Sequence, residues 1–204
     1  MSIFNEQLDQ NEANYAPLSP VSFLRRAAQI APDSTAIVHG ERRYSYSQFW
    51  ERSCRLASAL TRRGIGPGDC IAIMAANTPE MLEAHNGVPM MGAVLNSLNI
   101  RLDAGTIAFI LDHGQARVLI TDRAFSATIA EALQKIERQL LVIDIDDPVA
   151  PEGELIGDTD YESLLEEGDN VYHSNQPGDE WQALSLLYTS GTTGNPKGCV
   201  YHHR

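Results

Sequence analysis

The predicted fold rests on the stretch CIAIMA at residues 70–75, a continuous apolar run with the length of one strand. A strand that faces solvent on one side alternates apolar and polar residues, whereas this run contains no polar residue. Strands of this kind are buried on both faces, as in a parallel sheet that helices cover on both sides. The turn GPGD at residues 66–69 precedes the run and marks where the strand begins.

The same succession of helix and apolar strand repeats three times on the carboxyl side of this run. Thr78-Pro79 is expected to start a helix towards Met90, and whether Pro89 lies inside that helix or ends it early stays open. The further elements that we expect are a strand at 93–95, a helix from the cap Asp103 to Gly114, a strand at 118–121, a helix at 123–137 and a strand at 140–145. Strands that alternate with such helices predict an α/β fold with a doubly wound, mostly parallel sheet.

Shorter elements are predicted on the amino side. Ser19-Pro20 has the pattern of an N-cap followed by proline at the first helical position, and Pro32 ends that helix. Its expected apolar face consists of Phe23, Leu24, Ala27, Ala28 and Ile30. A hairpin is expected from 36–39 and 43–45, and a capping box at 45–48 then opens a helix that ends at Gly64. In that helix Trp50 and Cys54 lie at helical spacing with Ala57 and Leu60, which favours a place in the core.

Composition excludes several classes of protein. The 204 residues are 43% apolar and 21% charged, which is typical of a globular domain and not of a disordered chain. No run approaches the roughly 18 apolar residues that a membrane-spanning helix needs, and the polar, acidic first residues do not resemble a secretory signal. Cys54, Cys70 and Cys199 form no CxxC pair, so we expect neither disulfides nor a zinc site, and the cytoplasm is the expected compartment.

The net charge of −12 is concentrated in one segment. Residues 139–196 contain 13 Asp or Glu and no Lys or Arg. Such a surface repels phosphate, and the chain has no basic stripe, so we expect no nucleic acid partner. The segment is either a partner-binding tail or a solvated surface connection. Gly153, Gly157, Gly168 and Pro177 interrupt it, and it still carries Leu155, Leu164, Leu165 and Trp181, which favours the surface connection.

A last predicted strand, at 183–188, runs directly into the loop TSGTTGNPKG at 189–198. Seven of these ten residues are Gly, Ser or Thr, and one is lysine. Glycines allow backbone N–H groups to approach an anion, hydroxyls donate hydrogen bonds, and the lysine adds positive charge, so the loop is predicted to hold phosphate. Ligands of open α/β sheets bind at the carboxyl ends of strands, where this loop lies. The alternative is a solvent-exposed turn with an incidental lysine.

The loop does not have the Walker A pattern. That pattern requires Gly directly before Lys and Ser or Thr directly after it, whereas Pro196 precedes Lys197 and Gly198 follows it. Pro196 also disfavours helical backbone at Asn195, so we expect that no helix starts at this loop. An NTPase of the Ras kind is therefore disfavoured.

At 189–198 the sequence resembles the signature phosphate loop of the adenylate-forming (AMP-binding) superfamily, with every position matched. Three other stretches look like its acyl-CoA synthetase branch, most of all the enzymes for medium-chain, aryl or methylthio-substituted acids: NYAPL at 14–18, GVPM at 87–90 and LNSLNIR at 95–101. The resemblance implies that residues 1–204 are the N-terminal part of the large adenylation domain, with the C-terminal domain absent. The segment alone is then expected to be inactive.

The same resemblance implies a two-step ligase whose substrates are a small carboxylic acid, ATP and coenzyme A. The acid first forms an acyl-adenylate, and coenzyme A then displaces AMP. In this likeness Ser190, Thr192, Thr193 and Lys197 bind the β- and γ-phosphates through side chains, Gly191 and Gly194 bind them through the backbone, and Thr189 helps to hold Mg²⁺. Lys197 is also the expected catalytic cation. A protein nucleophile is not required.

Two alternatives stay open. The phosphate loop equally fits an adenylation domain that loads an amino or aryl acid onto a carrier protein, and a catalytically silent nucleotide-binding module. The assembly state is also open, with a homodimer as one choice. The chain departs from the family at His202, where Ser or Thr is common, and this gives the pair His202-His203. Consecutive strand residues point to opposite faces, which disfavours a shared metal.

Overall fold

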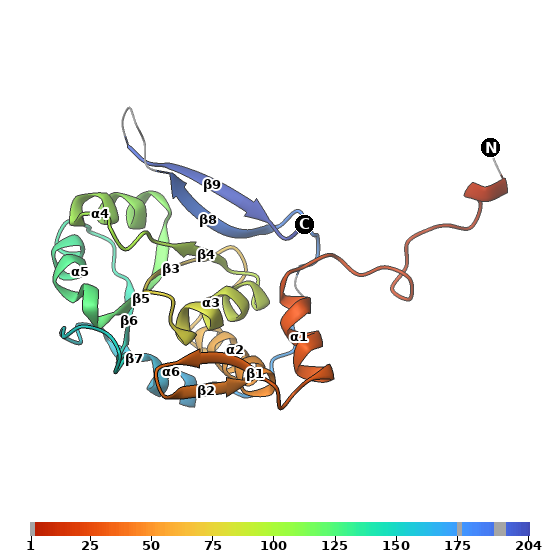
Figure 1. Ribbon diagram of the computed structural model, residues 1–204. Helices are drawn as coiled ribbons and strands as arrows, with labels where there is room; N and C mark the ends of the chain where they lie inside the picture. Colours follow the sequence, from red (N-terminus) through yellow and green to blue (C-terminus); the bar gives the residue numbers. More distant parts are fainter. Residues whose placement is uncertain (1–2, 175–176, 190–194) are drawn as a thin grey trace.

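The computed structural model describes residues 3–174, 177–189 and 195–204 (Figure 1). Its centre is a seven-stranded sheet with the order β7-β6-β5-β3-β4-β8-β9, in which every neighbouring pair is parallel except β8 and β9. The strands are β3 (Cys70–Met74), β4 (Val94–Ser97), β5 (Ala116–Asp122), β6 (Leu141–Ile145), β7 (Thr159–Asp160), β8 (Ala183–Thr189) and β9 (Lys197–His202). The mostly parallel α/β sheet predicted from the sequence is thus confirmed.

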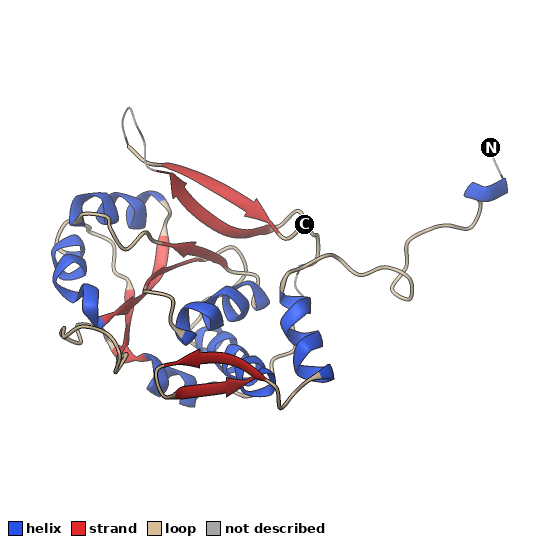
Figure 2. Ribbon diagram, in the orientation of Figure 1, coloured by secondary structure: helices blue, strands red, loops and turns tan. Residues whose placement is uncertain are grey.

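Helices cover both faces of this sheet (Figure 2). The α-helices are α1 (Val21–Ile30), α2 (Tyr46–Arg62), α3 (Pro79–Met90), α4 (Ala104–His113), α5 (Ser126–Leu133) and α6 (Tyr161–Glu167). Short 3-10 helices are η1 (Ile3–Asn5) and η2 (Arg123–Phe125), and β1 (Thr35–His39) pairs with β2 (Arg42–Ser45) in a separate antiparallel hairpin. Within the described residues, no helix is both long and apolar enough to cross a bilayer.

The central strand shows why the apolar run dictates this arrangement. Ile71 and Ile73 belong to the core under α2, α3 and α6, whereas Cys70, Ala72 and Met74 belong to the core under α4 and α5. Successive side chains of a strand point to opposite faces, so a strand that lacks polar residues must be covered on both sides. Leu119, Ile120 and Val142 in the neighbouring strands are buried as well, as the apolar runs at 118–121 and 140–145 lead one to expect.

The first helix differs from its prediction at both its cap and its apolar face. The N-cap position is Pro20, not Ser19, although Ser19 Oγ accepts a long hydrogen bond from the Val21 amide (3.4 Å). Phe23 and Ile30, expected on the buried face, are 76% and 69% exposed, and only Leu24 is fully buried. The helix packs mainly against α2 and α3 at the edge of the molecule, so fewer of its apolar side chains are buried than its sequence suggested.

The structure also settles where two other helices, α3 and α5, end. Pro89 lies inside α3, one residue before its end. The last turn tightens there, because the amides of Met91 and Gly92 donate to carbonyls three residues earlier. The helix expected to reach Glu137 ends at Leu133 instead, after which Ile136 packs against the core from irregular backbone.

The acidic segment contains a helix that the sequence analysis did not predict. Tyr161, Leu164 and Leu165 of α6 are buried against the core beneath α2. Ion pairs join this segment to α2 on the outside: Arg52–Glu162 at 2.5 Å, Arg63–Glu167 at 2.5 Å and Arg62–Asp169 at 2.5 Å. The arginines of α2 therefore neutralise part of the negative charge that follows it by about a hundred residues.

The hairpin β1–β2 covers part of the carboxyl edge of the sheet. Arg42 of β2 donates to Glu80 at the start of α3 (2.6 Å) and to Asp147 after β6 (3.2 Å), and both carboxylates are almost fully buried. His39 lies 2.8 Å from the same Asp147. The hairpin therefore covers the carboxyl ends of β3 and β6. Strand β8 lies on the opposite side of β3 from β6 in the sheet.

The predicted capping box is present and gives a first testable prediction. Ser45 Oγ accepts from the Gln48 amide at 3.3 Å, and Gln48 Oε1 accepts from the Ser45 amide at 2.9 Å. Ser45→Ala is expected to lower the free energy of unfolding by about 1 kcal/mol, because an orphan donor of the first turn loses its partner. Urea unfolding measures this change. The exposed Ser47 of the same turn is the matched control, and Ser47→Ala should stay within about 0.5 kcal/mol of the parent chain; equal losses in both variants would contradict the prediction.

Candidate functional site

The candidate phosphate loop is the connection of the hairpin β8–β9. The strand predicted to end at Tyr188 continues to Thr189, and β9 begins at Lys197 directly after Pro196. No helix starts at the described end of the loop, as the proline predicted. Thr189 and Lys197 are partners in the antiparallel register, and Thr189 Oγ1 donates a long hydrogen bond to the Lys197 carbonyl (3.4 Å). The hairpin thus brings the two ends of the motif together.

Only part of the predicted site can be placed. Ser190, Gly191, Thr192, Thr193 and Gly194 lie outside the described residues. The remaining predicted members, Thr189 and Lys197, are both exposed. Among the described residues, no carboxylate forms an ion pair with Lys197.

The two placed residues fit the groups that the resemblance implies. An exposed ammonium without a carboxylate partner can bind a phosphate without first breaking an ion pair. A hydroxyl oxygen such as that of Thr189 is a hard ligand of the kind that Mg²⁺ accepts, although Mg²⁺ takes most of its ligands from water and substrate phosphates. The Thr189 hydroxyl as a single protein ligand is consistent with this preference of Mg²⁺.

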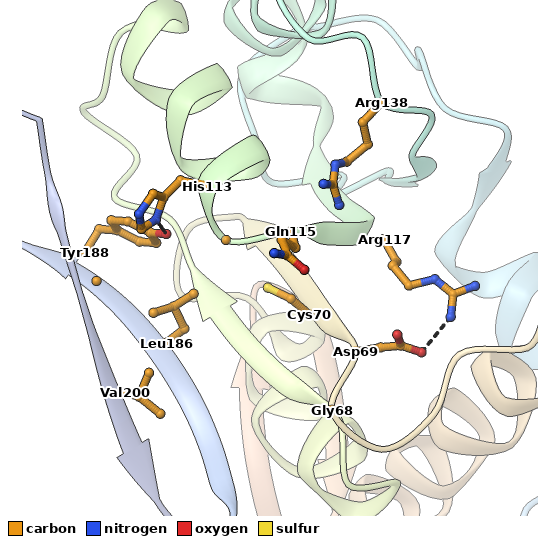
Figure 3. Close-up of a pocket in the computed structure, with 12 residues that line it drawn as sticks. Gly68, Asp69, Cys70, His113, Gln115, Arg117, Arg138, Leu186, Tyr188 and Val200 are labelled. Atoms are coloured by element: carbon orange, nitrogen blue, oxygen red, sulfur yellow. Dashed lines mark hydrogen bonds and ion pairs between the residues drawn. The ribbon is translucent and has the colours of Figure 1, made fainter.

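The two faces of the hairpin differ in character. By strand alternation Thr189 and Lys197 share a face with Leu187 and Tyr201, which are 38% and 52% exposed. The opposite face turns towards the end of α4 and the start of β3 and lines one side of an open cavity of about 400 Å³ (Figure 3). The lining residues are Gly68, Asp69, Cys70, His113, Gly114, Gln115, Arg117, Arg138, Leu186, Tyr188, Gly198 and Val200.

Gly198, the last residue of the motif, has a packing role. It lies opposite Tyr188 in the register, and a Cβ at this position would stand 2.9 Å from Leu186 Cδ1 and 3.4 Å from Tyr188 Cζ. The absence of a side chain therefore lets the Tyr188 ring lie close to the β9 backbone. The close contact between Tyr188 and Gly198 therefore fixes the two residues that adjoin Thr189 and Lys197.

Tyr188 reaches across the cavity to the end of α4, a contact that the sequence analysis missed. Its hydroxyl lies 2.7 Å from His113 Nδ1, and the two rings meet edge to face at 5.8 Å between centroids (Figure 3). Burial raises the pKa of Tyr188, so the hydroxyl keeps its proton at neutral pH. The residues are 75 positions apart, and no local pattern links them.

The other side chains of the cavity are already partnered or unreactive. Arg117 pairs with Asp69 at 2.7 Å. Burial raises the pKa of the Cys70 thiol to about 11, so it is no thiolate nucleophile at neutral pH. Gln115 adopts a left-handed backbone (φ 52°), while Gly114 before it leaves room for Leu186, because a Cβ there would stand 3.3 Å from Leu186 Cδ2.

The histidine pair at the end of β9 has structural contacts. His202 packs against Trp181 with ring centroids 4.4 Å apart and planes tilted by 51°, and the buried His203 places Nδ1 2.9 Å from Ser19 Oγ. Burial lowers the pKa of His203, which keeps the ring neutral. Nowhere in the described ranges do three or more His, Cys, Asp or Glu side chains gather as a metal site. The pair ties the base of the hairpin to the segment before α1.

Comparison with known proteins gives consistent matches over nearly the whole chain. The family profile described as "AMP-binding enzyme" matches residues 24–204. A peroxisomal acetate/butyrate–CoA ligase of Arabidopsis thaliana is 46% identical, with 98% of this chain and 37% of the relative covered. A peroxisomal benzoate–CoA ligase of the same plant is 41% identical, with 95% and 35% covered. The chain thus spans little more than a third of the length of these curated relatives.

Solved structures show the same fold. An anthranilate CoA ligase in complex with anthranoyl-AMP superposes with a TM-score of 0.83 at 23% identity, over 95% of this chain and 36% of that one. A fatty acyl CoA synthetase of Mycobacterium tuberculosis gives a TM-score of 0.70 at 26% identity, over 91% and 34%. The sheet and its two helical layers are therefore an arrangement that recurs in these proteins.

Proposed function

This chain belongs to the AMP-binding enzyme family, and we propose that it serves an ATP-dependent acid–thiol ligase as the amino-terminal part of the adenylation domain. The observation that carries the proposal is the stem of the hairpin. It holds Thr189 beside Lys197, a lysine without an ion pair among the described residues, at the carboxyl end of a strand of the parallel sheet. A triphosphate fits there because the site offers a hydroxyl and a free cation.

The proposed reaction has two steps. A carboxylate oxygen attacks the α-phosphorus of ATP and pyrophosphate leaves; the thiol of coenzyme A then loses its proton and attacks the acyl carbon, and AMP leaves. In the first step Lys197 neutralises negative charge that grows on the departing pyrophosphate. Thr189 would hold Mg²⁺, which when bound screens the phosphate oxygens from one another. The loop residues 190–194 complete the cradle in this proposal, with hydroxyl and backbone donors.

The acid is proposed to be a short aliphatic or an aryl carboxylate. Relatives named acetate/butyrate–CoA ligase and benzoate–CoA ligase support this range, and the medium-chain and methylthio-substituted acids suggested by the sequence resemblance extend it. A role in fatty acid metabolism follows if aliphatic acids are preferred. We keep the cytoplasm as the proposed compartment, although these relatives carry the word peroxisomal in their names; microscopy of a fluorescent fusion distinguishes the two.

The test is acid-dependent exchange of pyrophosphate into ATP by the complete ligase, followed by acyl-CoA formation, over acetate, butyrate, benzoate and a medium-chain acid. We expect exchange with at least one acid and a thioester only when coenzyme A is added. The 204-residue chain alone, expected to lack turnover, is the negative control. Exchange without a CoA thioester, but with transfer to a carrier protein, favours the carrier-loading alternative. ATP binding without any exchange favours the silent module. Light scattering of the same sample tests the homodimer.

A further inference from the structure

We propose that Tyr188 and His113 position the phosphate loop, by fastening the hairpin β8–β9 to the end of helix α4. The proposal rests on the proposed function, because it concerns how Thr189 and Lys197 are held for ATP. It assigns a positioning role to two residues that themselves need not touch the nucleotide.

Side chains hold the hairpin near its tip, because Leu186 and Tyr188 of β8 pack against the core under α4. The described register joins β8 to the sheet at a single pair, Leu95 with Ser185, and residues 186–189 extend beyond it. Both Leu187 and Val200 are substantially exposed, at 38% and 61%. Past the single ladder pair, β8 and β9 continue as a two-stranded ribbon, which is only marginally stable without packing against the rest of the domain. Its tip therefore depends on whatever side chain links it to the body of the domain.

Tyr188 makes such a link one residue from the motif. It directly precedes Thr189 and lies opposite Gly198, which directly follows Lys197. Its hydroxyl shares a 2.7 Å hydrogen bond with His113 Nδ1, and its ring packs against the core under α4. A displacement of Tyr188 would thus move both placed ends of the loop together.

The other end of the link is fixed in the body of the domain. His113 is the last residue of α4 and stacks on Phe109, with ring centroids 5.2 Å apart and planes 24° apart. Ile107, Ile110 and Leu111 hold the same helix to the sheet and are at most 1% exposed. The imidazole itself is exposed, but the helix that carries it is fixed by buried packing, and Phe109 orients the ring.

The first test compares two Tyr→Phe variants of the complete ligase. Tyr188→Phe keeps the ring and deletes the hydroxyl, and we expect kcat/KM for ATP in adenylation to fall about three- to tenfold, the factor that corresponds to one hydrogen bond. KM for the acid and thioester formation from supplied acyl-adenylate should stay within about twofold. The control is Tyr201→Phe on the exposed face of the same hairpin, which should leave all three values unchanged. Equal effects of both variants would overturn the proposal.

A double-mutant cycle identifies the partner. His113→Phe removes the hydrogen-bonding partner of Tyr188 but keeps a ring to stack on Phe109, and the pair Tyr188→Phe/His113→Phe should be no slower than either single variant. His113→Asn restores a polar atom near the position of Nδ1 and should recover part of the loss. Additive losses would mean that the two residues act separately, and the proposal would be wrong.

A probe that does not require activity separates this proposal from the proposed function. Cys199 is exposed on the hairpin, whereas Cys54 and Cys70 are buried, so among the cysteines of these 204 residues a thiol-reactive fluorophore will label Cys199. Tyr188→Phe should increase the rotational freedom of that label without any substrate present, and Tyr201→Phe should not. Unchanged anisotropy in Tyr188→Phe overturns the positioning role even if the enzyme is an active ligase. Absence of exchange in the parent enzyme refutes the function alone.

Discussion

Replacing Lys197 by alanine is expected to slow acyl-adenylate formation by about 10²–10³-fold, or about 2.7–4 kcal/mol. Lys197 is exposed at the first position of β9 and lies beside Thr189 in the register. Negative charge moves towards pyrophosphate as the bond to the α-phosphorus breaks. A cation that contacts the β- and γ-phosphates therefore stabilises the transition state of adenylation more than it stabilises the complex with bound substrates. Thioester formation should suffer less, because pyrophosphate has by then departed.

Single-turnover measurements separate the two steps: formation of acyl-adenylate from ATP, and formation of the thioester from supplied acyl-adenylate. Lys197→Arg keeps the charge and should recover part of the rate. The chain offers a matched control in Lys135, its other lysine, which pairs with Glu131 on an exposed helix surface. Lys135→Ala should leave both steps unchanged. If Lys197→Ala slows both steps equally, or leaves adenylation within about twofold, the loop is an exposed turn and the assigned role is wrong.

The second large effect concerns stability. Arg52→Met is expected to lower the free energy of unfolding by about 3–5 kcal/mol, because it leaves a buried carboxylate without its cation. Arg52 Nε donates to Glu83 Oε1 at 2.6 Å, and the Glu83 side chain is fully buried. The same guanidinium also holds Glu162 and stacks on the Tyr44 ring, with Cζ 4.9 Å from its centroid.

The loss should depend on pH with a defined sign. Burial raises the pKa of Glu83, and Arg52 opposes that rise, so removing Arg52 raises it further. A carboxyl whose pKa is higher in the folded than in the unfolded chain binds more protons when folded, so its burial costs stability as the pH rises through that interval. Urea unfolding should therefore show a smaller deficit for Arg52→Met at pH 5 than at pH 8.

Two further variants make this prediction specific. Glu83→Gln in the Arg52→Met background removes the unpaired charge and should restore part of the stability. Arg62→Met on the same helix breaks an ion pair whose partners are both more than half exposed, and it should cost less than about 1 kcal/mol. Similar losses for Arg52→Met and Arg62→Met, or a deficit that does not change with pH, would contradict the argument.

The sheet was predictable because continuous apolar runs in the sequence indicate strands that are buried on both faces. The run at 70–75 and the strands at 118–121 and 140–145 lie within or beside β3, β5 and β6, since continuous apolar residues and capped helices are local signals. The lack of a helix at the described end of the phosphate loop was also predictable, because Pro196 disfavours helical backbone before it, but the pairing of β9 with β8 was not predicted. Local sequence signals were sufficient to predict an element wherever its conformation depends on its own residues.

Features set by packing between distant segments were not predictable. Phe23 carries the apolar signal of a core residue, yet α1 has neighbours on only one side and leaves it exposed. Helix α6 is hidden in an acidic stretch because seven residues give too few turns for a clear period. The link between His113 and Tyr188 depends on how a hairpin crosses the end of a helix 75 residues away, and no spacing rule encodes that.

The packing of α6 on α2 has a consequence for dissecting this protein by deletion. The segment from Tyr161 to Asp169 supplies both buried side chains beneath α2 and acidic partners for its arginines. A chain shortened to end before residue 159 would keep every strand from β3 to β6 but would uncover the apolar underside of α2. A deletion that keeps the underside of α2 covered must therefore retain the chain through Asp169, well past the end of β6.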